Sequence, residues 1–285
     1  MKKITVVIPI YDGLHEIKAC LNSLMNSSNK IDFEVLLVND NPNNQSIERL
    51  LVFFQNKYEN IKVIKNRKNM GFSYSVNRGM KHCDGDVVLL NSDTEVANSF
   101  IDKFYYLLTL RNNIGTISSL TNNGTILSLP NYNRSTEFSD KFNVNEYQSL
   151  IDKMLPNINI SDSKMLLQIP TAIGHCMLIT RNLINSIGYF DAETFGKGYG
   201  EENDFSQRGR IAGFENYAAM NIFVLHKGSV SFKENRSELV KRHAKIVYKR
   251  YPFLKWRTRL FVLSYNPVKK LCKALKNRGS HEFNN

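Results

Sequence analysis

The first half of the chain alternates short apolar runs with segments in which apolar residues recur every three or four positions. The short runs are typical of buried strands, and the longer segments have the period of amphipathic helices. Strands separated by helices pair in parallel, because each helix returns the chain across the sheet. We therefore predict an α/β fold with a mixed, mostly parallel, Rossmann-like sheet flanked by helices. The expected strands are residues 4–10, 33–38, 61–64, 87–90, 114–118, 176–179 and 218–225.

Polar residues follow three of these expected strands. They are Asn39 and Asp40, then Asn91, Ser92 and Asp93, and finally His226. Ligands of such sheets bind beyond the carboxyl ends of the strands, so these groups should converge. Asp93 and His226 could then hold a divalent cation with positions open for a diphosphate. The alternative is that Asp93 is a turn or helix-capping residue and His226 a structural histidine.

A second candidate site is a cluster of carboxylates after a glycine-rich stretch. Glu201, Glu202 and Asp204 follow residues 195–200, which contain three glycines. Acids are favourable in the first turn of a helix, and that explanation stays open. The other explanation is a general base that deprotonates a hydroxyl, with glycines that let the substrate approach closely.

The net charge of +12 divides the 285 residues in two. Residues 233–285 hold fifteen Lys/Arg and three Asp/Glu, so residues 1–232 are neutral. We predict a catalytic body over 1–232 and a basic helical tail over 233–285. The four scattered cysteines form no CxxC pair, which argues against a disulfide framework or a cysteine zinc site.

The tail combines basic and apolar residues in a way that predicts an anionic membrane surface as its partner. Val240, Ala244, Val247 and Tyr251 form an apolar stripe, and Trp256 follows among arginines. A basic helix packed on the body is the alternative. No run of eighteen apolar residues and no export signal are seen, so we expect a cytoplasmic protein, peripheral on the inner face of the membrane. Residues 119–166 are polar and weakly patterned, and we expect an excursion over the site.

Taken in order, these motifs resemble those of family-2 glycosyltransferases with the GT-A fold, over most of residues 3–232. Any one segment is a loose match, but the ordered set is specific. The matching segments are Val6 to Tyr11, Val38-Asn39-Asp40, Asn69 to Phe72, Asn77-Arg78-Gly79, Gly85 to Asp93, Gly174 to Arg181, Ile187 to Asp191, Gly200 to Phe205 and His226 to Ser229.

The resemblance implies a role for each candidate residue. A divalent cation, Mn or Mg, would be held by Asp93 and His226. Glu202 would be the base, Glu201 would orient the acceptor, and Asp204 would be the nearest competitor for the base. Asp40 would recognise the uracil base of the donor. The remaining donor-binding residues would be Pro9, Tyr11, Asn69, Gly71, Asn77, Asn91 and Ser92.

Three positions depart from the family pattern. Asn39 replaces an acid, although Asp40 remains to recognise the nucleotide base of the donor. Asn91 replaces the first acid of Asp-x-Asp, which leaves Asp93 as the direct ligand and lowers the negative charge. Glu202 stands where Asp is commoner, so its carboxylate would reach about one methylene further, and Asp204 stays open as the base.

The implied reaction is an inverting transfer from a nucleotide sugar to a hydroxyl of a glycan or lipid-linked acceptor, in cell-surface polysaccharide synthesis. UDP is the expected nucleotide, with dTDP as the alternative. A sugar nucleotidyltransferase is expected to have a glycine-rich basic loop after the first strand, where this chain has Tyr11-Asp12-Gly13-Leu14. A Rossmann dehydrogenase is expected to have GxGxxG at the same place, and that motif is absent there. Nucleic-acid binding rests on the tail alone, so nucleic acid is not the expected partner.

Overall fold

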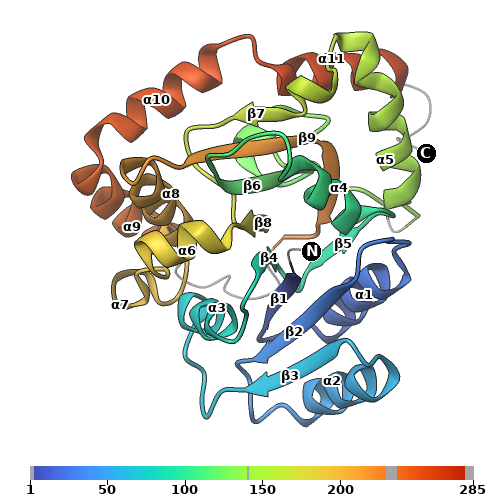
Figure 1. The fold of residues 1–285 in the computed structure, drawn as a ribbon, viewed down its shortest axis with the longest axis vertical. Coiled ribbons are helices and arrows are strands. Elements are labelled where there is room, and N and C mark those ends of the chain that lie inside the picture. The colour runs from blue at the N-terminus through green and yellow to red at the C-terminus, as the bar shows by residue number, and fades with distance from the viewer. Residues whose placement is uncertain (1–2, 140, 229–235, 280–285) are drawn as a thin grey trace.

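The computed structural model describes residues 3–139, 141–228 and 236–279. Within these residues, nine strands form one mixed sheet in the order β3-β2-β1-β4-β8-β6-β9-β5, with β7 paired to β9 (Figure 1). The first four strands pair in parallel, as the alternating pattern predicted. They are β1 (Ile4–Ile10), β2 (Phe33–Asn39), β3 (Ile61–Lys65) and β4 (Asp86–Leu90).

The second half of the sheet contains the antiparallel pairs. The strand β8 runs antiparallel to both β4 and β6, and β6 is parallel to β9, so β9 runs in the same direction as β4. Both β5 and β7 are antiparallel to β9. The bounds are β5 (Thr94–Val96), β6 (Ile114–Thr121), β7 (Leu166–Gln168), β8 (Cys176–Ile179) and β9 (Glu215–His226).

Helices cover both faces of the sheet, and alternate residues of β1 show why its apolar run is continuous. Val6 and Ile8 pack in one core cluster with α1 (Leu14–Asn26), α2 (Gln45–Lys57) and α4 (Phe100–Leu107). Val7 points the other way, into a cluster with side chains of three other helices of the body. These helices are α3 (Phe72–Lys81), α6 (Arg181–Ile187) and α8 (Glu201–Ile211), with the short α7 (Ala192–Phe195) nearby.

Residues 119–166 are more ordered than we expected. They contain the helix α5 (Val144–Met154), in which the Tyr147 ring packs edge-to-face against Phe223 of β9 with 4.7 Å between the ring centroids. Three short 3₁₀ helices complete the segment: η1 (Thr125–Leu127), η2 (Pro156–Ile158) and η3 (Asp162–Lys164). Most of the segment therefore forms its own core on β9, and only its first residues reach the site.

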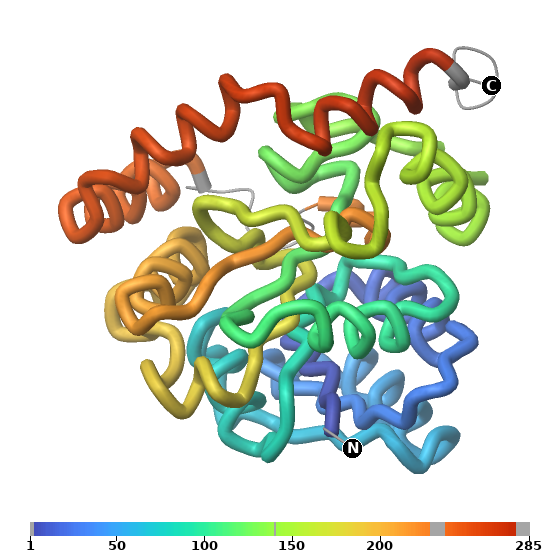
Figure 2. Tube along the Cα trace, turned by 45° about the horizontal axis from the view of Figure 1, so that its top comes forward, coloured from blue at the N-terminus to red at the C-terminus, as the bar shows by residue number. Residues whose placement is uncertain are grey.

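The tail forms three helices along the edge of the molecule opposite the N-terminus (Figure 2). They are α9 (Arg236–Arg250), α10 (Pro252–Leu263) and α11 (Pro267–Gly279). The apolar stripe predicted to face a membrane packs partly on the body instead: Val247 is buried against Phe195, and Tyr251 bonds to Asp204. The alternative of a helix packed on the body is thus correct for α9.

Two further expectations concern the chain as a whole. The predicted boundary between residues 232 and 233 lies in residues 229–235, outside the described residues. Across the described parts of the chain, none of the helices combines the length and the apolar character needed to cross a membrane.

Candidate active site

A cleft of about 350 Å³ opens at the carboxyl edge of the sheet, within the size range of small-molecule sites. The ends of β1, β2, β4 and β9 all reach it, because these strands run in the same direction. Among the described residues that line it, five are Asp or Glu and only Lys197 is a Lys or Arg. The predicted site residues found in the lining are Pro9, Tyr11, Asp40, Gly71, Asn91, Ser92, Asp93, Glu201, Glu202 and His226.

The pairing of β5 with β9 brings Asp93 and His226 together. Thr94 is the register partner of His226, and the Lys227 amide donates to the Asp93 carbonyl at 3.0 Å. The His226 Nε2 atom lies 3.5 Å from Asp93 Oδ2. Two ligands in neighbouring octahedral positions at about 2.1 Å from one ion are roughly 3 Å apart, so small shifts would let both atoms bind one cation.

Hydrogen bonds fix how His226 presents its ring. Its Nδ1 lies 3.0 Å from the Asn123 carbonyl oxygen, which only accepts, so Nδ1 carries the proton in this bond. In the neutral ring Nε2 then presents its lone pair beside the Asp93 carboxylate. Two acceptors in this position suit a shared cation, and a backbone carbonyl on the other ring nitrogen is typical of metal-binding histidines.

Asn91 adds a neutral oxygen to this corner of the cleft. Its Oδ1 atom is buried and has no hydrogen-bond partner among the described residues. The backbone amide of Asn91 donates to the His175 carbonyl oxygen at 2.9 Å, which holds Asn91 in place after the end of β4. The described residues contain no group of three or more His, Cys, Asp and Glu side chains that could hold a metal. The ligands that the structure brings together are thus one carboxylate and one imidazole. They fit a cation whose remaining ligands are diphosphate oxygens, water and, if it turns to the ion, the Asn91 amide oxygen.

The turn after β2 is organised around the buried Asp40. Its carboxylate accepts from the amides of Met70 and Gly71, both at 2.8 Å, and from Asn66 Nδ2 at 2.7 Å. Gly71 has φ of +93°, which favours glycine, and an added Cβ would lie 2.5 Å from the Gly196 carbonyl oxygen. Asp40 therefore joins two loops at the cleft and still lines it.

Two predicted donor-binding residues lie outside the described lining. Asn69 Oδ1 accepts from the Gly71 amide at 3.0 Å and supports that turn. Asn77 exchanges hydrogen bonds with the backbone of Phe190, at 2.8 and 2.9 Å, and so ties α3 to the segment before α7. The structure gives both residues supporting contacts and no contact with the cleft.

The pair Glu201 and Glu202 enters the cleft at the first turn of α8. Glu201 is buried, and its burial, followed by the nearby charge of Glu202, raises the pKa of its carboxyl well above the usual value. Burial also raises the pKa of Glu202, against bonds from backbone amides that lower it. Glu202 accepts from the Gly200 amide at 3.2 Å and from Asn203 Nδ2 at 3.1 Å. A carboxylate with a raised pKa is suited to general-base chemistry.

Asp204 has different surroundings from the other two acids. It is 1% exposed and is absent from the described lining of the cleft. Its Oδ2 accepts from Arg208 Nε at 2.8 Å, and its Oδ1 accepts from Arg250 Nη1 at 2.8 Å and Tyr251 OH at 3.0 Å. These bonds support the alternative that Asp204 braces the start of α8.

Sequence reasoning missed how the tail supports the glycine-rich loop. Three consecutive residues, Gly198, Tyr199 and Gly200, have positive φ. The buried His243 of α9 places Nδ1 3.0 Å from the Gly198 carbonyl oxygen and 2.8 Å from that of Tyr199, and so donates to them. No local pattern pairs residues 198 and 243.

His175 is a second missed residue. It lines the cleft, its Nε2 lies 2.8 Å from Ser119 Oγ, and its ring stacks on that of His226 at 5.5 Å. Burial, and then the neighbouring His226, lower the pKa of His175 well below the usual value, so it is neutral. Its place just before the expected strand at 176–179 was a signal that could have found it.

Comparison with known proteins identifies the family of this chain. The family model "Glycosyl transferase family 2" matches residues 5–188, more than half of the chain. The chain belongs to this family. The match contains the turns at Asp40 and Asp93, whereas Glu202 and His226 lie beyond its end.

Curated relatives of this family-2 glycosyltransferase match over part of their length. The poly(ribitol-phosphate) beta-glucosyltransferase of Bacillus spizizenii is 32% identical over 106 residues, which are 36% of this chain and 17% of the relative. The dolichol-phosphate mannosyltransferase of Pyrococcus furiosus is 26% identical over 133 residues, 46% of this chain and 37% of the relative. The matches thus span well under half the length of these two relatives.

Solved structures confirm the GT-A fold predicted for this family-2 glycosyltransferase. The mannosyltransferase PcManGT from Pyrobaculum calidifontis, in complex with GDP-Man and Mn2+, has a TM-score of 0.62 at 12% identity, covering 98% of this chain and 76% of its own. GalNAc-T7 with UDP, GalNAc and Mn2+ has a TM-score of 0.64 at 16% identity, covering 97% and 55%. At these identities the likeness concerns the fold.

Proposed function

We propose that this family-2 glycosyltransferase transfers a sugar, with inversion, from a nucleotide diphosphate donor to an acceptor hydroxyl. The observation that carries the proposal is the approach of Asp93 and His226 to 3.5 Å at the strand ends, in the same cleft as Glu202. The cleft therefore offers a cation site for a leaving diphosphate and a carboxylate for the attacking hydroxyl.

The charge of the cleft supports metal dependence. Five lining carboxylates face one lysine, so the described residues cannot neutralise a diphosphate by themselves. Asp93, His226 and the amide oxygen of Asn91 would hold the cation. A bound Mn²⁺ or Mg²⁺ would offset the negative charge that develops on the leaving diphosphate. Mn²⁺ in the two solved structures is consistent with such a site.

We assign the base to Glu202 and an orienting role to Glu201. A sugar hydroxyl is a poor nucleophile at neutral pH, and a carboxylate within hydrogen-bond reach assists its deprotonation as it attacks. Glu202 lines the cleft, whereas both carboxylate oxygens of Asp204 accept from Arg208, Arg250 or Tyr251. Burial raises the pKa of Glu201 and so favours its protonated form, whose carboxyl can donate a hydrogen bond to the acceptor.

The donor side of the cleft favours a UDP-sugar. Pro9, Tyr11 and Asp40 line the end next to β1 and β2, where the base and ribose would lie. A carboxylate such as Asp40 can accept the N3–H of uracil, and thymine offers the same group, so dTDP is the alternative. The acceptor would be a glycan or lipid-linked hydroxyl in cell-surface polysaccharide synthesis.

A panel of nucleotide sugars tests this proposal directly. Purified protein is given UDP-, dTDP- and GDP-sugars with Mn²⁺ or with EDTA, and release of the nucleoside diphosphate is measured. We expect release from UDP-sugars with Mn²⁺, little with EDTA, and none from Asp93→Ala. The control is Asp32→Ala, an exposed acid at the other end of β2, which should match the wild type. Full activity in excess EDTA would contradict the metal assignment.

A further inference from the structure

The outer face of α10 carries an exposed apolar stripe. Its side chains recur at intervals of three or four residues, so at about 100° per residue they share one face of the helix. Tyr265 continues the stripe just past the helix end. The exposed fractions are 79% for Phe253, 62% for Trp256, 65% for Leu260, 68% for Leu263 and 68% for Tyr265.

The opposite face of α10 is already used for packing on the body. Leu254 is buried in a cluster with Phe195 and Val247, and Phe261 and Val262 pack against the core formed by α5, β9 and α11. This packing fixes the rotation of α10. The outward stripe therefore follows from the fold and is covered by none of the described residues.

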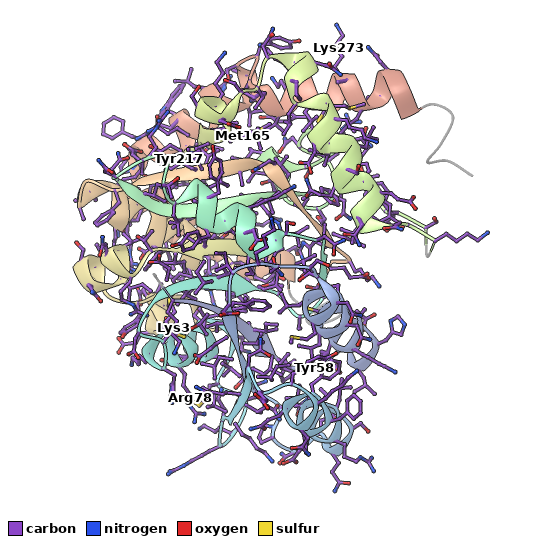
Figure 3. All side chains as sticks on the ribbon, turned by 45° about the vertical axis from the view of Figure 1, so that its right-hand side comes forward. Lys3, Tyr58, Arg78, Met165, Tyr217 and Lys273 are labelled. Carbon is purple, nitrogen blue, oxygen red and sulfur yellow. The ribbon has the colours of Figure 1, made fainter. Side chains whose placement is uncertain are left out.

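Basic side chains border the stripe on both sides. On the helix, Arg257 follows on one side of it, and Lys255 and Arg259 lie on the other. The Arg259 guanidinium lies 5.9 Å from the Trp256 ring, and the Lys270 ammonium lies 5.6 Å from the Tyr265 ring. Lys273 of α11 is a further cation of the tail, at the end of the molecule far from Tyr58 and Arg78 (Figure 3).

We propose that this stripe is a membrane-docking surface, with α10 lying in the plane of an anionic bilayer. An in-plane helix needs a narrow apolar face for the acyl boundary and cations at its edges for lipid phosphates. Trp and Tyr are the side chains favoured at that depth. A second copy of the chain fits less well, because it would place two strongly basic tails against each other. The inference concerns a surface outside the cleft, so it stands apart from the proposed transferase chemistry.

Trp256 provides the test, since it is the only tryptophan of the chain. The full-length protein is mixed with vesicles of phosphatidylcholine alone or of phosphatidylcholine with the anionic lipid phosphatidylglycerol. We expect flotation with the anionic vesicles, a blue shift of Trp256 emission, and quenching by brominated lipid. The three cations on α10 alone should favour anionic over neutral vesicles on the order of a hundredfold, and high salt should reduce binding.

Two charge-matched double variants separate the stripe from overall charge. Phe253→Glu with Leu260→Glu should weaken vesicle binding by at least about tenfold. Val52→Glu with Phe53→Glu adds the same two negative charges on the exposed face of α2 and should bind as the wild type does. Both variants should release diphosphate at the wild-type rate with a soluble acceptor, so a failed transferase assay leaves the vesicle result interpretable.

Three outcomes would overturn the proposal. One is equal vesicle binding by the two double variants. Another is a dimer, measured by light scattering, that the α10 variant abolishes in the absence of lipid. The third is salt-sensitive binding of the tail to RNA or DNA without any capture by anionic vesicles.

Discussion

The brace between α9 and the start of α8 can be tested by replacing Arg250 with methionine. Arg250 Nη1 donates to Asp204 Oδ1 and to Asp191 Oδ2, both at 2.8 Å, and Nη2 donates to Thr194 Oγ1 at 3.1 Å. Methionine keeps an apolar stem against Phe195 and removes all three bonds. We expect a less stable protein with the same fold.

The expected loss follows from the burial of each partner. Asp204 is 1% exposed, and a hydrogen bond to a buried charge contributes about 1.5 to 3 kcal/mol. The bond to Asp191 is partly exposed to solvent and contributes at most about 0.5 to 1 kcal/mol. Asp204 keeps Arg208 and Tyr251, so the free energy of unfolding should fall by about 2 to 4 kcal/mol. For a chain of this size the melting temperature should fall by about 3 to 7 °C.

Thermal and urea unfolding, followed by circular dichroism, measure this loss. Lys249→Met is the matched control, because Lys249 is the exposed neighbour on α9 and lies outside the brace. Equal midpoints for Arg250→Met and Lys249→Met would refute the reasoning. The brace would then add nothing to stability.

Three further predictions concern the cleft. His226→Ala should raise the Mn²⁺ concentration for half-maximal turnover by about tenfold or more, and an unchanged value would remove His226 from the metal site. The raised pKa of Glu201 makes the wild-type protein lose stability as pH rises above about 4.5, by about 1.4 kcal/mol for each unit by which the pKa is raised, and Glu201→Gln should not show this loss. Urea unfolding of both proteins between pH 5 and 8 measures the difference in their free energies of unfolding. A difference that stays constant with pH would contradict the prediction. Gly71→Ala should unfold at a lower temperature than Gly213→Ala. Gly213 is the control because it also has a positive φ, but nothing lies within 4 Å of a Cβ added there. Equal unfolding midpoints would show that the close approach of Gly71 to Gly196 is unimportant.

The parallel half of the fold could be predicted because its central strands, β1 and β4, are buried on both faces. A continuous apolar run such as residues 4–10 then has one interpretation, and the helical period between strands fixes their direction. The helix α5 was missed although its buried side chains, Val144, Tyr147, Ile151 and Met154, have helical spacing. Polar neighbours rich in Asn hid that period.

The site was predictable where it depends on strand ends. Asp93 and His226 are far apart in sequence, but strands of one direction place their carboxyl ends at one edge, and the two residues meet there. The contacts of Asp204 with Arg250 and Tyr251 could not be predicted in this way, because they depend on how α9 docks on the body. For the same reason the apolar stripe was expected on residues 240–251, whereas α10 carries the exposed one.

The role proposed for Glu202 is to deprotonate the acceptor in a metal-dependent sugar transfer. Its most direct test is the turnover of Glu202→Gln at saturating donor and acceptor, because this change keeps shape and removes basicity. We predict a loss on the order of a hundred- to ten-thousand-fold, with donor binding little changed. Asp204→Asn should cost less turnover, or lose it through lower stability. Near-normal turnover by Glu202→Gln, with a well-folded Asp204→Asn inactive, would contradict the claim and reverse the two roles.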